Sequence, residues 1–359
     1  MHIPDGYLSP ATCGALGAAM VPFWYRATRR LKRIVTSRYV PVLAIGAAFS
    51  FLVMMFNIPV PDGTTAHAVG AVMIAIVLGP WAAVVAVSIA LVIQALFFGD
   101  GGVLAIGANC FNMAVVMPFV GYWVYRALSR GTALTATRRA VAAGIGGYVG
   151  INVAALTAAV EFGLQPTLFH TANGTPLYAP FHLSQTIPAM ALAHLTVAGI
   201  AEFVVSFGVV AYLQRANVPL LRINHPDVPV TETELERRRP LTWRHALVLF
   251  GILVALTPLG LLAPGTAFGE DAPADLVSKY HLSAVPQGLQ RFSSFWSHAL
   301  LGGYGFNSGE HPVVGYIVSA VVGCAVITLV LIGVVVLYRA VSGRLRSGGP
   351  TDDTEEVTA

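Results

Sequence analysis

Charged residues are scarce in this chain. Asp, Glu, Lys and Arg together make up 11% of its 359 residues, against about 25% in an ordinary soluble domain. Apolar residues make up 56%, and the mean hydropathy is +0.71. A soluble fold of this size cannot hide that much apolar surface and still cover itself with charge. The composition excludes disordered, fibrous and disulfide-stapled secreted proteins, and it predicts an all-α membrane protein with several spans.

Cysteine and lysine are also rare. The three cysteines, Cys13, Cys110 and Cys324, lie far apart in apolar stretches, so their spacing indicates neither a zinc motif nor a disulfide framework. A P-loop needs Gly-Lys followed by Ser or Thr, and neither Lys32 nor Lys279 has that context. We therefore expect no ATP site in this chain, so that any ATP that drives it is hydrolysed by another subunit. The net charge of +4 gives no argument for nucleic acid as a partner.

Long apolar runs dominate what is present. A helix needs about 20 mostly apolar residues to cross the hydrocarbon core of a bilayer. The candidate spans are residues 9–27, 39–57, 64–79, 80–98, 103–127, 138–161, 184–213, 243–263 and 312–338. The third run is short and ends at a Gly-Pro turn signal, so the third and fourth runs can instead form a broken or re-entrant pair.

The basic residues are distributed unevenly between the two predicted faces. Nineteen of the 21 fall in four segments on one side, namely 26–38, 126–139, 215–244 and 339–346. Only Lys279 and Arg291 fall on the other side. Because basic residues concentrate in cytoplasmic loops, this asymmetry predicts nine spans, with the amino terminus outside and the carboxyl terminus in the cytoplasm.

A polar segment with four prolines, residues 215–242, divides the chain. We interpret it as a cytoplasmic linker. It follows a seven-span module, residues 1–214, and precedes a two-span module, residues 243–345, which carries a long outer loop over 264–311. A polar tail, 346–359, follows the last span.

The amino-terminal residues carry the most specific chemistry. The α-amino group of Met1, the amide nitrogen of His2 and its Nδ1 can close two adjacent chelate rings on one ion. A fourth nitrogen would complete a square, a geometry that favours Ni(II) or Cu(II). His67 is the candidate for it, because it lies at the predicted outer start of the third run and ionisable residues in such segments are usually functional. The alternatives are an ordinary terminal histidine at position 2 and an interfacial histidine, capped by a carbonyl, at position 67.

Further polar residues are predicted at the same outer end. Asn57, Asp62, Asn109 and Asn112 follow or begin spans there. Such side chains can hydrogen-bond to metal-ligating histidines and orient them. The alternative is that they make ordinary loop and interhelical contacts.

Two other features are open to more than one interpretation. His194 and Glu202 are eight residues apart in the seventh run, two helical turns on one face, and can form either a proton relay or an interhelical contact. Ala11, Ala15 and Ala19 recur at four-residue spacing in the first run. Small residues at this spacing let another helix approach closely, either within the bundle or from a partner protein.

Three short motifs carry a family resemblance. Residues 1–10 read MHIPDGYLSP, residues 61–67 read PDGTTAH and residues 107–113 read GANCFNM. They resemble the nickel/cobalt substrate-specific components of energy-coupling-factor (ECF) transporters, the NikM/CbiM type, over about residues 1–215. The segment 243–345 resembles the small accessory subunit of the NikN/CbiN type.

The resemblance implies a ligand set and partners. The metal is held by the Met1 amine, by the amide and imidazole of His2 and by His67. The face formed by Ala11, Ala15 and Ala19 docks on a transmembrane coupling subunit, and two cytoplasmic ATPases drive the release of metal inside. The protein would reside in the lipid bilayer of the bacterial inner or plasma membrane.

We therefore predict a transporter subunit, not an enzyme, that binds Ni(II) or Co(II) as its transported substrate. Nickel is favoured because the IPDG opening resembles the nickel type and a planar nitrogen site suits Ni(II). The alternatives are a cobalt importer that supplies cobalamin biosynthesis and a proton-coupled secondary metal transporter that uses His194 and Glu202. A membrane-embedded metalloenzyme is a third possibility.

Overall fold

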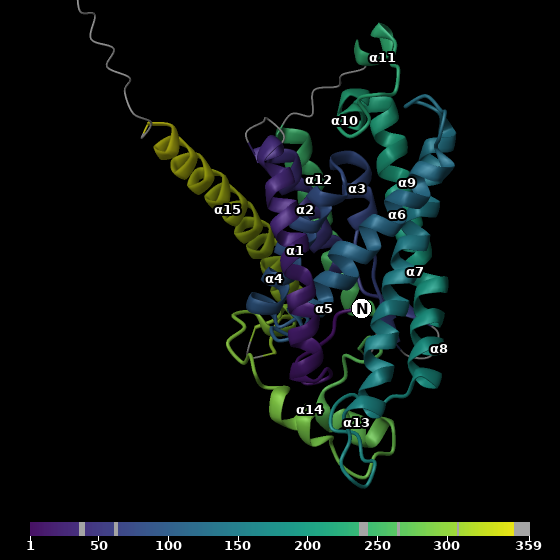
Figure 1. Cartoon of the computed structure of the whole chain (residues 1–359), viewed down its shortest axis with the longest axis vertical. Coiled ribbons are helices and arrows are strands. Elements are labelled where there is room, and N and C mark those ends of the chain that lie inside the picture. Colours follow the sequence, from purple (N-terminus) through teal and green to yellow (C-terminus); the bar gives the residue numbers. More distant parts are fainter. Residues whose placement is uncertain (36–39, 61–63, 237–242, 264–265, 307–308, 348–359) are drawn as a thin grey trace, which may run out of the picture.

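The computed structural model describes residues 1–35, 40–60, 64–236, 243–263, 266–306 and 309–347. Most of them are helical (Figure 1). The α-helices are α1 Pro10–Val35, α2 Val40–Met54, α3 Ala71–Leu78, α4 Pro80–Ile93, α5 Ile106–Cys110, α6 Met117–Leu128, α7 Thr137–Leu168, α8 Leu183–Ala193, α9 Gly199–Ala216, α10 Val218–Arg222, α11 Glu232–Glu236, α12 Trp243–Leu256, α13 Pro273–Lys279, α14 Gln287–Phe292 and α15 Pro312–Ser347. The π- and 3-10 segments are η1 Gln94–Phe98, η2 Phe111–Val116, η3 His194–Ala198, η4 Thr257–Leu262 and η5 Gly302–Tyr304. A small departure from the all-α expectation is the antiparallel pair β1 Ile58–Val60 and β2 Thr64–Ala66.

The core of the bundle is built where helices approach closely. α7 packs against α6, α8 and α9, while α4 packs against α1, α2 and α3. Small residues allow the tightest crossings. A Cβ atom on Gly121 of α6 would lie 2.7 Å from the carbonyl oxygen of Gly146 of α7. A larger side chain at Gly121 would therefore force α6 away from α7.

Four helical stretches among the described residues are both long and apolar enough to cross a bilayer. They are Pro80–Phe98, Thr137–Leu168, Leu183–Ala216 and Pro312–Val334. The helices Val40–Met54 and Leu247–Leu262 are apolar but shorter. These lengths agree with a multi-pass helical membrane protein. The count of nine spans and their orientation in the bilayer remain predictions.

The predicted third run, residues 64–79, does not form one spanning helix. It begins with β2 and turns at Gly70, which has φ +73°, before the eight residues of α3. Eight residues make a helix of about 12 Å, whereas the hydrocarbon core is about 30 Å thick. All eight residues of α3 are buried. α3 is apolar because it is buried inside the protein, so it has the composition of a membrane span but not the length of one. This agrees with the alternative in which the third and fourth runs form a broken pair.

The C-terminal helices pack against helices of the first part of the chain. α12 and α15 pack against α2, and α15 also packs against α4. α13 and α14 lie at the lower end of the molecule in Figure 1, opposite α10 and α11 at the upper end. Part of the predicted linker, 237–242, and most of the predicted tail, 348–359, lie outside the described residues.

Candidate metal site

The amino-terminal segment runs into the bundle instead of lying on its surface (Figure 1). Met1, His2 and Ile3 are 4%, 2% and 0% exposed. The first helix, α1, starts at Pro10, and the Ser9 hydroxyl accepts a hydrogen bond from the Thr12 N–H at 3.0 Å. This is an N-cap followed by proline at the first helical position. Nine non-helical residues therefore precede the first helix, and the earliest of them are buried.

Backbone hydrogen bonds fix this segment in place. The Ile3 N–H donates to Asn109 Oδ1 at 2.8 Å, and Asn109 Nδ2 donates back to the Ile3 carbonyl at 3.1 Å. The Gly102 N–H also donates to the Ile3 carbonyl, at 2.8 Å. Asn109 is one of the polar residues that the sequence predicted beside the ligands. Its amide group satisfies both backbone groups of the residue that follows His2.

The carboxylate of Asp5 holds the next part of the segment. It accepts hydrogen bonds from the N–H groups of Val103 at 3.1 Å and Leu104 at 2.8 Å. Burial raises the pKa of Asp5 above its ordinary value, although these backbone N–H groups act in the opposite direction. The glycine-rich stretch before Leu104 thus packs directly on the amino-terminal segment.

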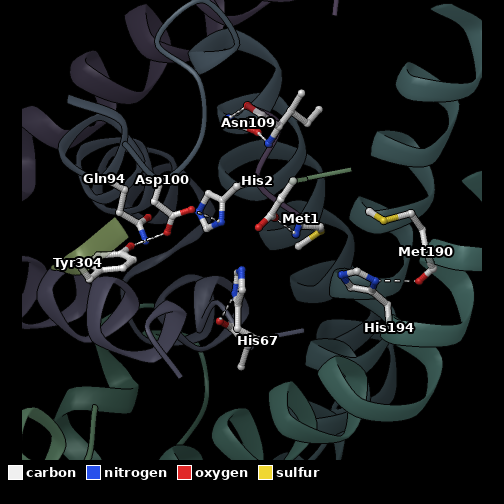
Figure 2. Close-up of polar contacts among 12 residues, drawn as sticks. Met1, His2, His67, Gln94, Asp100, Asn109, Met190, His194 and Tyr304 are labelled. Atoms are coloured by element: carbon white, nitrogen blue, oxygen red, sulfur yellow. Dashed lines mark hydrogen bonds and ion pairs between the residues drawn. The ribbon is translucent and has the colours of Figure 1, made fainter. Parts of the chain in front are cut away.

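The imidazole rings of His2 and His67 face each other inside the bundle, with ring centroids 5.0 Å apart (Figure 2). Both residues are buried, at 2% and 5% exposure. The Nδ1 of His67 is 3.0 Å from the Ala68 carbonyl oxygen. If Nδ1 carries the proton and donates this bond, Nε2 keeps its lone pair for a metal, an arrangement frequent among metal-ligating histidines.

Two ring nitrogens at this place have no hydrogen-bond partner among the described residues. They are Nε2 of His2 and Nε2 of His67, and both are buried. A buried polar atom without a partner destabilises a fold by about 1–3 kcal/mol, and such atoms call for an explanation such as an ion. Together with the Met1 amine beside them (Figure 2), these nitrogens could hold a divalent cation.

The amine of Met1 and the Nδ1 of His2 each contact a carboxylate. The α-amino nitrogen lies 3.2 Å from Glu270 Oε1, and His2 Nδ1 lies 3.3 Å from Asp100 Oδ1. The predicted chelate uses both of these nitrogens. In the described geometry, closing it would require the amine to leave Glu270 and the imidazole to turn away from Asp100.

Asp100 is itself held by residues from two parts of the chain. The Tyr304 hydroxyl, from η5, donates to Asp100 Oδ2, and Gln94 Nε2 donates to Asp100 Oδ2 at 3.2 Å and to the Tyr304 hydroxyl oxygen at 2.9 Å. The Tyr304 ring stacks on Phe98 with centroids 5.1 Å apart. The segment 266–306 therefore reaches the site through both Glu270 and Tyr304.

Within the described ranges, no three His, Cys, Asp or Glu side chains gather into a metal-binding group. The amine and amide nitrogens of the amino-terminal chelate could supply further donors to a metal site at His2 and His67. Carboxylates are close, but they contact the predicted ligands instead of forming a carboxylate site of their own.

Two other residues predicted at the outer end, Asn57 and Asn112, have partners other than the two histidines. Asn57 follows α2 and hydrogen-bonds to Tyr316 of α15. Asn112 donates through Nδ2 to Glu161 at 2.8 Å and accepts from the Thr157 hydroxyl at 2.8 Å, both on α7. Asp62 lies outside the described residues.

His194 and Glu202 make different contacts from each other. His194 Nδ1 lies 2.8 Å from the Met190 carbonyl oxygen, one turn earlier in its own helix. Figure 2 shows its ring across Met1 from His2. Glu202 accepts hydrogen bonds from the N–H groups of Val69 and Gly70. The two residues thus face different surroundings, although they share one continuous helical stretch.

The face of α1 that carries Ala11, Ala15 and Ala19 is exposed. A groove of about 400 Å³ lies between α1 and α7, lined by Ala11, Ala15 and Leu16 on one side and by Val160, Leu164 and Leu168 on the other. No helix among the described residues therefore fills the alanine face.

Several residues of the site were not predicted from the sequence, among them Glu270. Glu270 is 269 positions from Met1 in the chain, and no motif around it indicated a contact with the amino terminus. The pairing of Asp100 with His2 was not predicted either. Both contacts depend on how distant segments pack, which spacing along the chain does not reveal.

Comparison with known proteins gives the class and the family. The fused nickel transport protein NikMN of Rhodobacter capsulatus is 49% identical over 343 residues, covering 91% of this chain and 95% of the relative. The probable fused nickel transport protein LarMN of Lactiplantibacillus plantarum is 45% identical over 339 residues, covering 93% and 97%. A crystal structure of a truncated transition metal transporter matches with a TM-score of 0.56 and 58% identity, covering 59% of this chain and 98% of that one.

These similarities and the apolar helices define the class, a multi-pass membrane protein that is a transporter component and not an enzyme. Residues 2–220 match the family model CbiM, described as the cobalt uptake substrate-specific transmembrane region. The chain belongs to the CbiM family.

Proposed function

We propose that this chain is the substrate-binding membrane subunit of an ATP-driven ECF-type importer for Ni(II). The observation that carries the proposal is the pair of buried imidazoles, His2 and His67, whose Nε2 atoms lack partners beside the Met1 amine. A cation that enters this space would meet nitrogen donors on several sides. The two nearly full-length relatives named as nickel transport proteins support the choice of metal.

The ligands that we propose are the Met1 amine, the amide and imidazole of His2, and Nε2 of His67. Nitrogen donors in a plane favour Ni(II) or Cu(II) over the octahedral oxygen-preferring cations. Since the family model is described by cobalt uptake, Co(II) is the competing substrate, and a cobalt supply for cobalamin biosynthesis is the alternative function. Asn109 would support the site by holding the backbone of Ile3.

The partners that we propose are a transmembrane coupling subunit and two cytoplasmic ATPases, which would hydrolyse the ATP. The exposed face of Ala11, Ala15 and Ala19 and the groove beside it favour α1 as the docking surface. Because small residues allow close backbone approach, a helix of the coupling subunit can pack in this groove.

We further propose that successive segments of the chain have different roles. Residues 1–214 form the metal-binding module, and 215–242 form a cytoplasmic linker. Residues 243–345 form the accessory module, and its outer loop, 264–311, would cover the site from outside. The contact between Glu270 and the Met1 amine and the contact between Tyr304 and Asp100 support this role for the loop.

The experiment that tests the function is Ni(II) titration of the purified full chain by calorimetry and absorption spectroscopy. We expect a 1:1 complex with the absorption of a planar nitrogen site. His67→Ala and a variant with one extra residue before Met1 should each abolish that spectrum. If either variant binds Ni(II) as the parent does, the proposed ligand set is wrong.

A further inference from the structure

Glu202 is a buried acid that the proposed metal site does not use directly. It lies in α9, is fully buried, and its Oε2 accepts hydrogen bonds from the N–H groups of Val69 at 2.8 Å and Gly70 at 2.9 Å. These two N–H groups come two and three residues after His67. They also lie at the start of α3, where the helix dipole favours a negative charge.

The Val69 N–H belongs to the same peptide group as the Ala68 carbonyl. That carbonyl is the group that the His67 ring contacts through Nδ1 at 3.0 Å. Because a peptide group is planar and rigid, a hydrogen bond to its N–H on one side fixes the direction of its carbonyl on the other. Glu202 thereby sets the orientation of the acceptor that holds the imidazole of His67.

The turn that follows His67 contains a glycine in the left-handed conformation and is held by a second hydrogen bond. Gly70 adopts the left-handed conformation with φ +73°. The Ser50 hydroxyl of α2 donates to the Val69 carbonyl at 2.7 Å. The turn is therefore held from α9 by Glu202 and from α2 by Ser50. Of the two, only Glu202 bonds to the peptide group that contacts the His67 ring.

We propose that Glu202 is a positioning residue for the metal ligand His67, acting through the Ala68–Val69 peptide group. This inference rests on the proposed function, since it takes His67 to be a ligand. It also assigns Glu202 a role different from a proton relay with His194. What the role requires is a hydrogen-bond acceptor at Oε2, and a neutral amide oxygen can provide one.

The test is Ni(II) titration of the purified full chain carrying Glu202→Gln or Glu202→Ala, with thermal unfolding measured in parallel. Loss of a residue that orients a metal-ligating histidine typically weakens metal affinity by about 10–100-fold. We expect Glu202→Ala to weaken Ni(II) binding by roughly tenfold or more and to alter the absorption spectrum. Glu202→Gln should retain the parent spectrum and an affinity within roughly threefold of the parent, since it keeps the acceptor.

The matched control is Thr186→Ala, which removes a buried hydrogen bond to the Ala159 carbonyl at 2.7 Å from the same helical stretch. It should lower the unfolding temperature without changing the Ni(II) spectrum. Parent-like binding by Glu202→Ala, or a Glu202→Gln protein as weak as Glu202→Ala, would overturn the inference.

The two proposals fail in distinguishable ways. If His67→Ala loses Ni(II) while Glu202→Ala binds as the parent does, only the positioning role is wrong. If His67→Ala binds as the parent does, the ligand set and the positioning role are both wrong. A Glu202→Ala protein that binds Ni(II) as the parent does but fails in uptake by cells would point to the proton relay and overturn the inference.

Discussion

At the scale of single residues, the site depends on amide groups that satisfy buried backbone atoms. Asn109 both donates to and accepts from Ile3, so its side chain replaces the partner that a strand would otherwise provide. A carboxylate could accept from Ile3 but could not donate back, and an apolar residue would leave both backbone groups unpaired. The position of His2 therefore depends on a residue more than 100 positions later.

The first prediction compares two asparagines of similar burial. Asn109→Ala should weaken Ni(II) binding by about tenfold or more, because the backbone beside His2 loses two hydrogen bonds. Asn112→Ala is the control, since Asn112 bonds to Glu161 and Thr157 instead. It should lower thermal stability by about 1–3 kcal/mol while leaving Ni(II) affinity unchanged. Calorimetric titration and thermal unfolding of both purified variants provide the measurements, and equal losses of affinity would contradict the assignment.

At the scale of elements, α1 is polarised between a buried face and an open one. Met20 and Ala27 are fully buried, whereas Ala11, Ala15 and Ala19 are exposed. An exposed face of small residues beside an apolar groove is suited to a helix that approaches within the membrane. The other wall of the groove, formed by α7, adds larger apolar side chains.

The second prediction concerns this face. Ala15→Leu should fill the groove and reduce co-purification with the coupling subunit at least severalfold, with a matching loss of uptake. Ni(II) binding by the isolated chain should stay at the parent level, because α1 at this point does not touch His2 or His67. Ala255→Leu, an equal enlargement at an exposed position of α12 outside the groove, is the control and should assemble normally. Normal assembly of Ala15→Leu would exclude this docking surface.

The sequence predicted the elements that have local signals. The first candidate span, predicted to begin at residue 9, corresponds to α1, which begins at Pro10 after the Ser9 N-cap. The Gly-Pro turn separated the third and fourth runs. The apolar composition of the third run was misleading, because a fully buried helix and a spanning helix have the same apolar composition. Hydropathy measures how readily a segment leaves water, and it does not distinguish the protein interior from lipid as the new environment.

At the scale of the whole molecule, the amino terminus and the segment that contains Glu270 and Tyr304 meet at one place although they lie far apart in the sequence. The prediction that His2 and His67 lie on the same side of the membrane agrees with the 5.0 Å separation of their ring centroids. The roles of Glu270 and Tyr304 could not be predicted, since 269 and 204 residues separate them from their partners, Met1 and Asp100. Contacts at such distances in the chain depend on the final packing of the C-terminal segments.

The third prediction tests this coupling. Tyr304→Phe keeps the ring that stacks on Phe98 but removes the hydroxyl that donates to Asp100. Since Asp100 then holds His2 less firmly, Ni(II) affinity of the purified full chain should change by at least severalfold. Tyr316→Phe removes the hydroxyl of a neighbouring tyrosine that bonds to Asn57, and its affinity should match the parent. Parent-like titrations for both variants would show that the C-terminal segment does not influence the site.

The contact between Met1 and Glu270 also has a consequence for biosynthesis. The amino-terminal segment is made first, yet the carboxylate that its amine contacts emerges 269 residues later. At a synthesis rate of about 5–20 residues per second, that is a delay on the order of tens of seconds. During this interval the helices of the first module can insert and pack, but the earliest residues cannot reach their final surroundings. The oldest part of each new molecule is thus among the last to be completed, and a ribosome that stops before Glu270 leaves it unfinished.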